Sequence, residues 1–367
     1  MNLFLKKLAQ LEDQNRLRSL KLPGGIDFSS NDYLGFRSHP SLKKAAIEAL
    51  ENGMDLGSGG SRLLRGHTEA HQNLEEFAAR YYGCGKTLYF ANGFMANYAL
   101  FTTLPTRHDV VVYDAYTHAS VRDGIHAGTA KSVKVPHNDL NAFEDVLKRY
   151  RDKAETLYIA IESVYSMDGD FAPLSELYKL AQLYEAILII DEAHGTGVWG
   201  KTGKGVSEGL PQENLVTLHT GGKALGVAGG LICASADIID MLINTARPFI
   251  YSTAPPPLQA YLMQKALELS ASDEGCTRRN DLRTLCTYAQ EKLSGAGSQI
   301  IPIILGDDKC AVDAASDMQK AGYDIRAIRP PTVPENTARL RLSLNAQLTK
   351  PQIDSVISAL ADYLPGI

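Results

Sequence analysis

Hydrophobic residues between about positions 87 and 235 fall into short runs that alternate with helical patterns. The runs are rich in β-branched residues, and the segments between them, such as LNAFEDVLKRY and LSELYKLAQLY, repeat apolar residues at helical spacing. Near-continuous apolar strands separated by helices predict an α/β fold with a mostly parallel sheet covered on both faces. Seven segments are predicted as its strands: TLYFA, DVVVYD, KSVKVP, TLYIAIE, AILIID, NLVTLHT and GGLICAS.

A different pattern follows residue 255 and predicts a smaller α+β domain. Its strands are expected in QIIPIILG, YDIRAIRPP and ARLRLSLNA, and helices at about 255–270, 278–293, 309–321 and 351–363. ARLRLSL alternates strictly, so one face of its strand is apolar and the other carries Arg339, Arg341 and Ser343. The predicted organisation is an N-terminal arm (1–45), a large domain (46–255), and linking helices with a small C-terminal domain (256–367).

Acidic residues end three of the predicted strands. Ligands of parallel sheets bind beyond the carboxyl ends of the strands. Asp114, Glu162 and Asp191 each come directly after an apolar run, so all three are placed for chemistry. Asp191 belongs to the stretch ILIIDEAHGTGVWGKTG, which also brings His194 onto the same turn.

This stretch satisfies three incompatible motifs. Its glycines fit both the phosphate loop G-x-x-x-x-G-K-[ST] and the dinucleotide fingerprint G-x-G-x-x-G, and ILIIDEAH resembles the magnesium-binding strand end of an ATP-driven helicase. A phosphate loop requires a helix that begins at its Gly-Lys-Thr. Three glycines and a proline follow Lys201 closely, which disfavours a helix there, and the dinucleotide motif lacks its helix for the same reason. The P-loop ATPase therefore stays only as a remote alternative.

Composition narrows the class of protein further. The chain has 367 residues, of which 44% are hydrophobic and 22% charged, as in ordinary globular proteins. The formal net charge of -5 gives no sign of nucleic-acid binding, and no apolar run is long enough to span a membrane. The five cysteines are scattered and form no zinc-ligand pairs, which predicts reduced thiols in a cytoplasmic protein and no metal site.

A second lysine lies among small residues in Thr220-Gly221-Gly222-Lys223-Ala224, directly after a predicted strand. A flat ligand can approach such a lysine closely, and a low-dielectric site makes its amine a better nucleophile. A strand-end carboxylate followed about thirty residues later by a strand-end lysine is the pair that pyridoxal 5'-phosphate requires. The lysine holds the aldehyde of this cofactor, and the carboxylate keeps its ring nitrogen protonated.

Two stretches upstream suit the same cofactor. NGFMAN follows a predicted strand and opens a helix, where free backbone N–H groups can bind a phosphate. YTHAS follows DVVVYD and would let His118 stack on a planar ring; capping of the next helix is the alternative role for this histidine.

With these motifs in place, the sequence resembles the α-oxoamine synthases, which are fold-type I pyridoxal-phosphate enzymes. They condense an amino acid with an acyl thioester and release carbon dioxide. The resemblance covers essentially the whole chain through FSSNDYLG, GSGGSRLLRGHTEAHQNLE, NGFMAN, YTHAS, ESVYSMDGD, DEAHGTGVWG, TGGKALG, YSTAPPP and RPPTVP. It implies a transferase with a homodimeric assembly and active sites shared between the subunits.

The resemblance also implies roles for individual residues. Lys223 would hold the cofactor and move protons, Asp191 would pair with its ring nitrogen, His194 would contact its phenolic oxygen, and His118 would stack on its ring. The remaining residues implied around the cofactor are Gly93, Phe94, Glu162, Ser166 and Thr220, with Ser252 or Thr253 reaching it from a partner subunit.

Substrate residues follow from the same resemblance. Asn31 and Thr332 are expected near the substrate, and Arg18 in the N-terminal arm near the acyl group. Arg329 and Arg341 compete for the carboxylate of the amino acid, and both stay open. RPPTVP and FSSNDYLG favour a member that uses L-alanine with pimeloyl-CoA or a pimeloyl carrier protein in biotin synthesis. The alternatives are the same chemistry on glycine and acetyl-CoA, and an aminotransferase on the same fold, whose products would include no released CoA.

Overall fold

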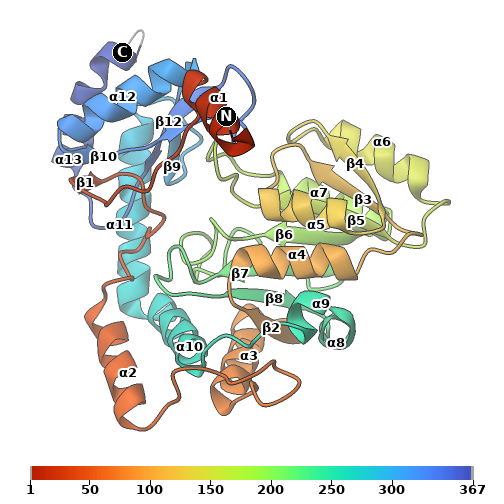
Figure 1. Ribbon diagram of the computed structural model, residues 1–367. Helices are drawn as coiled ribbons and strands as arrows, with labels where there is room; N and C mark the ends of the chain where they lie inside the picture. The colour runs from red at the N-terminus through yellow and green to blue at the C-terminus, as the bar shows by residue number, and fades with distance from the viewer. Residues whose placement is uncertain (1, 365–367) are drawn as a thin grey trace. The chain divides into compact units, whose positions relative to one another are not determined.

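A computed structural model describes residues 2–364 of the chain and divides them into two compact units. The larger unit comprises residues 34–166 and 171–279, and its centre is a seven-stranded sheet in the order β2-β8-β7-β6-β5-β3-β4 (Figure 1). All seven strands predicted from the sequence are present: β2 (Lys86–Phe90), β3 (Val110–Asp114), β4 (Lys131–Val135), β5 (Leu157–Glu162), β6 (Ile187–Asp191), β7 (Leu215–Thr220) and β8 (Gly230–Ala234). Only β8 runs antiparallel to its neighbours, so the predicted mostly parallel sheet is confirmed.

Helices cover both faces of this sheet. The strand residues alternate between two apolar clusters, as Val111 and Tyr113 belong to one and Val110 and Val112 to the other. The first cluster includes side chains from α4 (Gly93–Thr103), α5 (Ala119–Ala127), α8 (Ala236–Thr245) and α9 (Arg247–Ile250). The second includes side chains from α6 (Leu140–Tyr150) and α7 (Leu174–Leu183). Burial on both faces explains why the strands are almost continuously apolar.

Three further helices belong to the larger unit: α2 (Pro40–Glu51), α3 (Glu69–Tyr82) and α10 (Pro257–Ala271). α10 packs against both α2 and α3. For this reason the unit takes in residues 34–45 and 256–279, which the sequence pattern assigned to an arm and to linking helices. The long helix α11 (Asp273–Gln290) begins in this unit and continues into the other.

The second unit comprises residues 2–33, 167–170 and 280–364 of the described chain. It contains a three-stranded antiparallel sheet in the order β11-β12-β9 and a parallel pair of β1 with β10. Its elements are α1 (Leu3–Asp13), β1 (Ile26–Asp27), β9 (Ile300–Gly306), α12 (Asp308–Lys320), β10 (Tyr323–Asp324), β11 (Ala327–Ile328), β12 (Ala338–Ser343), α13 (Lys350–Ala359) and a short 3-10 helix (Ala361–Tyr363).

The prediction of a single strand in YDIRAIRPP was wrong. The segment divides into β10 and β11, which belong to different sheets. β10 pairs with β1, because the backbone of residues 26–28 bonds to the backbone of residues 322–324, for example from Ile26 N to Gly322 O at 2.8 Å. β11 pairs instead with β12. A pairing partner from the start of the chain cannot be recognised in a local pattern.

Strand β12 alternates as expected, yet both of its faces are buried. Arg339 donates to Asp168 at 2.6 Å, and Arg341 donates to Asn31 at 2.8 Å. These polar partners compensate the charges on the arginine face, which lets the face lie inside the unit.

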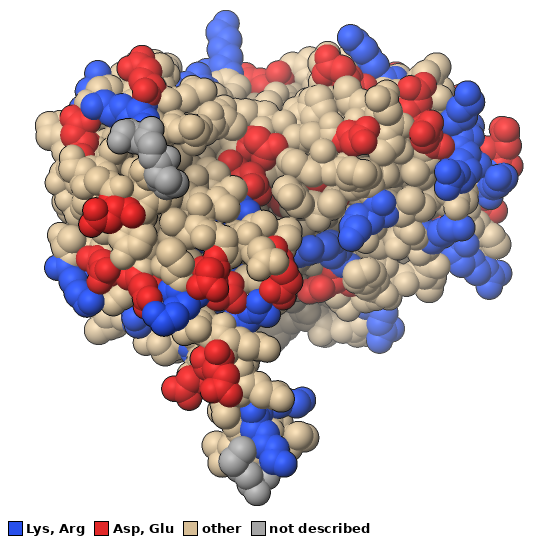
Figure 2. All heavy atoms as spheres, turned by 90° about the horizontal axis from the view of Figure 1, so that it is seen from above, with Lys and Arg blue, Asp and Glu red and all other residues tan. Residues whose placement is uncertain are grey.

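The glycine-rich stretch after β6 forms no phosphate loop. Residues 195–205, all within the described chain, form turns and bends with no helix at Lys201, and the side chain of Lys201 is exposed. Lysines and arginines lie among aspartates and glutamates over the face shown in Figure 2. The loop conformation agrees with the sequence-based rejection of a phosphate loop.

No helix within residues 2–364 is both long and apolar enough to cross a membrane.

Candidate active site

The carboxyl ends of the central strands bring the predicted cofactor residues together. Strands β5, β6 and β7 run parallel, and Glu162 and Asp191 end their strands side by side. One cavity opens at this edge of the sheet. Of the residues predicted around the cofactor, seven line it: Gly93, Phe94, His118, Glu162, Asp191, Thr220 and Lys223.

Lys223 and His194 approach each other closely at the cavity. The two strands β7 and β8 are antiparallel, and the loop that joins them carries Lys223. The amine Nζ of Lys223 lies 2.7 Å from Nε2 of His194. Gly226 holds the loop in place with a φ of +67°, and a Cβ there would lie 2.2 Å from the backbone N of Arg37, so only glycine fits. The small residues of this stretch therefore allow both the tight turn and access to the lysine.

Asp191 is held by two hydrogen-bond donors in an almost fully buried position. The backbone N of Ala193 donates to Oδ1 at 2.9 Å, and Nδ2 of Asn97 on α4 donates to Oδ2 at 2.7 Å. These two contacts fix the orientation of the carboxylate at the cavity.

Asn97 also connects Asp191 to His118. Its Nδ2 donates to Oγ of Ser120 at 3.0 Å, and this hydroxyl lies 2.8 Å from Nδ1 of His118. The backbone N of Ser120 donates to the same Nδ1 at 3.2 Å, so His118 also caps α5. A ring nitrogen that accepts a hydrogen bond carries no proton, so a neutral His118 holds its proton on Nε2. Burial lowers the pKa of His118 and thus favours this neutral form.

Glu162 lies beside Asp191 and is fully buried. Burial, with a further contribution from the charge of Asp191, raises the pKa of Glu162 well above its usual range. Its Oε2 accepts from the backbone N of Ser166 at 3.1 Å, whereas Oε1 has no hydrogen-bond partner among residues 2–364. The side chain therefore retains hydrogen-bonding capacity at the cavity.

Asp114, the third strand-end carboxylate, does not line this cavity. Its carboxylate accepts from the backbone N of Tyr116 at 2.7 Å and of Asn138 at 2.8 Å, and it lies 2.9 Å from Nδ1 of His137. It fixes the loop that leads to His118, so its contribution is structural rather than chemical.

The first turn of α4 faces the cavity from the other side. Asn92 caps this helix by accepting from Met95 N at 2.8 Å, and Gly93 and Phe94 follow it. N–H groups of a first turn have no acceptor within their helix and attract anions. Thr220 lies opposite, with its hydroxyl 3.1 Å from the carbonyl of Gly229. The helix end is a suitable place for a phosphate, and Thr220 lies beside it.

Ser252 and Thr253 do not line the cavity. They follow α9, where Ser252 is half-buried and Thr253 is exposed. Their predicted contact from a partner subunit stays a prediction.

The predicted substrate residues lie in the second unit, where they form two groups. In the first, Arg341 donates to Asn31 at 2.8 Å and to the hydroxyl of Tyr33 at 3.2 Å. Nε of Arg341 is buried and has no hydrogen-bond partner among the described residues. Burial raises the pKa of Tyr33 to about 12, so the tyrosine stays neutral and can donate.

The second group lies at a cavity of about 360 Å³, which two of its three members line. Arg18 and Arg329 both face it, together with Lys21 and Arg326. Burial and the neighbouring Arg18 lower the pKa of Arg329, while its guanidinium donates to the carbonyl of Asn15. Thr332 is exposed, and its backbone N bonds to the carbonyl of Arg329. The cavity is thus suited to an anionic ligand.

Three residues of these groups had no assigned role in the sequence: Asn97, Ser120 and Tyr33. Each lies inside a motif noted above, NGFMAN, YTHAS or FSSNDYLG. Membership of a motif was the only available signal, because their contacts join elements that are distant along the chain.

A family model for aminotransferase class I and II matches residues 23–360. The chain belongs to the aminotransferase class I and II family. Within this family the chain is 41% identical to the 8-amino-7-oxononanoate synthase of Chromobacterium violaceum, with 96% of both proteins covered. It is 39% identical to the enzyme of that name from Geobacter sulfurreducens, with 97% of this chain and 96% of the relative covered.

Solved structures of family relatives agree in fold. Serine palmitoyltransferase from S. paucimobilis, a lysine-to-alanine variant with a bound PLP–myriocin aldimine, superimposes with a TM-score of 0.89 at 25% identity, over 99% of this chain and 98% of that one. The 8-amino-7-oxononanoate synthase from Francisella tularensis gives a TM-score of 0.77 at 29% identity, over 92% and 97%. The fold-type I architecture expected from the sequence is confirmed.

Proposed function

We propose that this chain is an acyltransferase that condenses L-alanine with a pimeloyl thioester, carried by CoA or by a carrier protein. The products are 8-amino-7-oxononanoate, carbon dioxide and the free thiol, and the reaction belongs to biotin synthesis. Relatives named for this activity match nearly the full chain. The observation that carries the proposal is the placement of Lys223 against His194, at a cavity that Asp191 and His118 also line.

The donor set of the cavity fits pyridoxal 5'-phosphate. Besides the amine of Lys223, it offers a fixed carboxylate, an imidazole and a helix N-terminus. Oδ1 of Asn97 and Oε1 of Glu162 are buried without partners among residues 2–364, so polar atoms remain for a ligand. When bound, this cofactor withdraws electrons from the substrate carbon and so stabilises the negative charge that forms there.

Each residue of the cavity then has a proposed role. Asp191 faces the ring nitrogen, His194 the phenolic oxygen, and His118 one face of the ring. The phosphate is assigned to the residues at the start of α4 and the end of β7, which are Gly93, Phe94 and Thr220. Glu162 is proposed to line the remaining side, with Ser166 behind it, where its backbone N bonds to the Glu162 carboxyl.

Lys223 is the proposed proton carrier of the reaction. Its amine takes the proton from Cα of L-alanine and returns a proton to the same carbon after carbon dioxide has left. His194, 2.7 Å away, keeps this amine directed. Asp191, held in place by Asn97 and by the backbone of Ala193, would keep the ring nitrogen of the bound cofactor protonated, and the protonated ring favours loss of the Cα proton.

The two groups in the second unit are proposed to bind the anionic ends of the substrates. Arg341 and Arg329 are both candidates for the carboxylate of alanine, since each has a buried Nε without a partner among residues 2–364. Asn31 supports Arg341 directly. Arg18, which shares a cavity with Arg329, is assigned to the acyl substrate together with Thr332.

A thiol-release assay tests the substrate assignment. Purified protein is incubated with each pairing of L-alanine or glycine with pimeloyl-CoA or acetyl-CoA, and free CoA is measured. We expect release with L-alanine and pimeloyl-CoA. Release only with glycine and acetyl-CoA would contradict the proposal and assign the chain to glycine C-acetyltransferase. Arg341→Lys and Arg329→Lys, assayed in parallel, identify the alanine-binding arginine by a raised KM for alanine.

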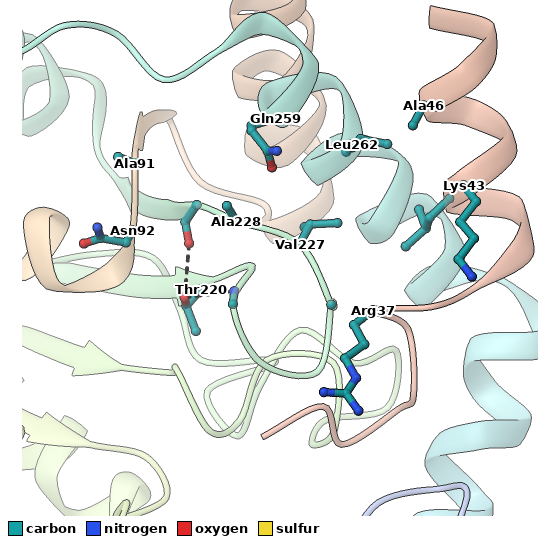
Figure 3. A pocket seen from close by; sticks show the side chains of 14 residues that line it. Arg37, Lys43, Ala46, Ala91, Asn92, Thr220, Val227, Ala228, Gln259 and Leu262 are labelled. Carbon is teal, nitrogen blue, oxygen red and sulfur yellow. Dashed lines mark hydrogen bonds between the residues drawn. The ribbon is translucent and has the colours of Figure 1, made fainter. Parts of the chain in front are cut away.

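A homodimer with shared sites is proposed from the surface of the larger unit. A second cavity of about 570 Å³ shares Thr220 with the first, and Figure 3 shows Lys43, Gln259 and Leu262 around it. Leu56, Leu64 and Tyr251 belong to GSGGSRLLRGH and YSTAPPP or lie next to them, and all three are exposed. We propose that these segments pack against a second copy, whose Ser252 or Thr253 would reach the phosphate. Light scattering should give twice the mass of one chain.

The cytoplasmic location stays a prediction from the cysteines, which are free in the structure.

A further inference from the structure

Glu192, between Asp191 and Ala193, has a fully buried carboxylate that does not face the cavity. Oγ of Ser163, just beyond β5, donates to its Oε2 at 2.6 Å. The backbone N of Ser207 donates to Oε1 at 2.6 Å, and that of Val206 to Oε2 at 3.1 Å. The carboxylate therefore joins the end of the neighbouring strand to the far end of the glycine-rich loop.

Two glycines of the loop leave room for this carboxylate. A Cβ at Gly195 would lie 1.9 Å from Oε2 of Glu192, and a Cβ at Gly205 would lie 2.5 Å from the carboxyl carbon. Gly205 also has a φ of +116°, which residues with side chains rarely adopt. The loop that resembles a phosphate loop thus surrounds an anion, but this anion is the protein's own side chain.

The backbone of Glu192 fixes the same turn. Its N–H donates to the carbonyl of Leu218 on β7 at 2.8 Å. Its carbonyl accepts from the backbone N and from the hydroxyl of Thr196, both at 2.8 Å. Through its backbone and its side chain, Glu192 consequently connects the turn that carries Asp191 and His194 to β7, to the end of β5 and to the far end of the glycine-rich loop.

A buried carboxylate of this kind is costly to the fold. Its donors are the hydroxyls of Ser163 and Ser207 and two backbone N–H groups, and burial raises the pKa of Glu192. A well-packed apolar side chain commonly stabilises such a site more than a charge does. Fixed polar contacts, in contrast, hold the turn in a single geometry. This turn carries His194, whose Nε2 lies 2.7 Å from Nζ of Lys223.

We propose that Glu192 is a positioning residue, whose carboxylate fastens the glycine-rich loop to the end of β5 and so fixes Asp191 and His194 against Lys223. The inference rests on the proposed function for its link to catalysis.

Glu192→Gln tests the proposal, because an amide has the same shape but only one oxygen to accept hydrogen bonds. In the cofactor-free protein, nitrogen NMR of selectively labelled histidine should show a changed His194 resonance. On titration with pyridoxal phosphate, the dissociation constant should rise about 10-fold, as expected for loss of a hydrogen bond to a charged group. The pH midpoint of the bound cofactor's visible absorbance should also shift.

Glu208→Gln is the matched control. Glu208 belongs to the same loop, and the hydrogen bonds recorded for its carboxylate within residues 2–364 go to Thr202, with the backbone N of that residue at 2.9 Å, and not to a strand end. Glu208→Gln should leave the cofactor dissociation constant within twofold of the wild-type value. The His194 resonance and the pH midpoint should not shift. Ser163→Ala removes a single donor and should change them in the same direction as Glu192→Gln, to a smaller extent.

A folded Glu192→Gln protein with the wild-type histidine spectrum, cofactor affinity and pH midpoint would overturn the proposal. If that variant does not fold, Ser163→Ala with wild-type values has the same force. Failure of the wild-type chain to bind the cofactor would instead count against the proposed function, and the histidine spectrum would still decide the role of Glu192.

Discussion

Two glycine-rich loops of the larger unit each contain a lysine. They differ in the group that the backbone of the loop surrounds. The stretch 195–207 follows β6, exposes Lys201, and encloses the carboxylate of Glu192. The stretch 220–226 leaves β7 and places Lys223 at a cavity, 2.7 Å from His194. Loops of similar composition therefore enclose a carboxylate of the protein in one case and border a cavity in the other.

The comparison shows what glycine does in each loop. In the first, the absent side chains make room for a carboxylate of the protein. In the second, Gly226 permits a close approach to the backbone of Arg37, and Gly222 leaves the space beside the lysine open. A glycine pattern indicates that something approaches the backbone closely, but it does not indicate whether this is a ligand or another part of the chain.

The two lysines provide the largest expected difference. Lys223→Ala should lower kcat for CoA release at least about 1,000-fold, because the proton carrier and the cofactor attachment are lost together. Lys201→Ala should retain wild-type kcat and KM, since its side chain is exposed. Steady-state assays of both variants make the comparison, and full activity of Lys223→Ala would end the proposed assignment.

Two glycines with positive φ separate backbone strain from the space needed by Glu192. Gly209→Ala, at φ +97° with nothing within 4 Å of an added Cβ, should lower the free energy of unfolding by about 1–2 kcal/mol. Gly205→Ala should lose about 1–3 kcal/mol more, because its Cβ would overlap the Glu192 carboxylate. Thermal unfolding measures the loss of stability in each variant. Equal losses would show that the Glu192 carboxylate can move aside without cost.

His219 joins the two stretches and gives the smallest expected effect. It is buried before Thr220, with ring nitrogens 2.8 Å from the hydroxyl of Thr196 and 2.9 Å from that of Thr217. Burial lowers its pKa to about 3. The unfolded chain, with a histidine pKa of about 6.5, therefore binds a proton that the folded chain does not, and stability falls as pH drops from about 6.5 towards about 3.

His219→Gln removes this pH dependence while keeping a polar side chain. The stability difference between wild type and variant should shrink between pH 6 and pH 5 by about 1 kcal/mol. Urea unfolding at several pH values measures it, and the exposed His108 provides a control through His108→Gln. A difference that stays constant with pH would mean that His219 is protonated in the folded chain.

The sequence predicted the parts of the fold that depend on local patterns. All seven strands of the main sheet appear, and the strand ends carry Glu162, Asp191 and Thr220 as expected. Lys223 could be singled out because its neighbours are small and a strand precedes it. The parallel topology brings these residues together, because the carboxyl ends of parallel strands lie at the same edge of the sheet.

Contacts between distant segments could not be predicted in the same way. Asn97 reaches Asp191 across 94 positions of sequence, and β1 pairs with β10 across almost the whole chain. Glu192 stands within the same motif as Asp191, yet its side chain points away from the cavity and into the loop. Nothing in the spacing distinguishes these two adjacent carboxylates.

The sequence by itself thus determined which candidate functional groups follow one another along the chain. They are a helix start that can bind an anion, a strand-end carboxylate, and a lysine among small residues. Tertiary structure decided which carboxylate faces the cavity, which lysine lines it, and which amide donates to Asp191. The physical reason is that hydrophobic periodicity follows from local backbone geometry. The environment of a polar group, in contrast, depends on which distant atoms surround it and exclude water.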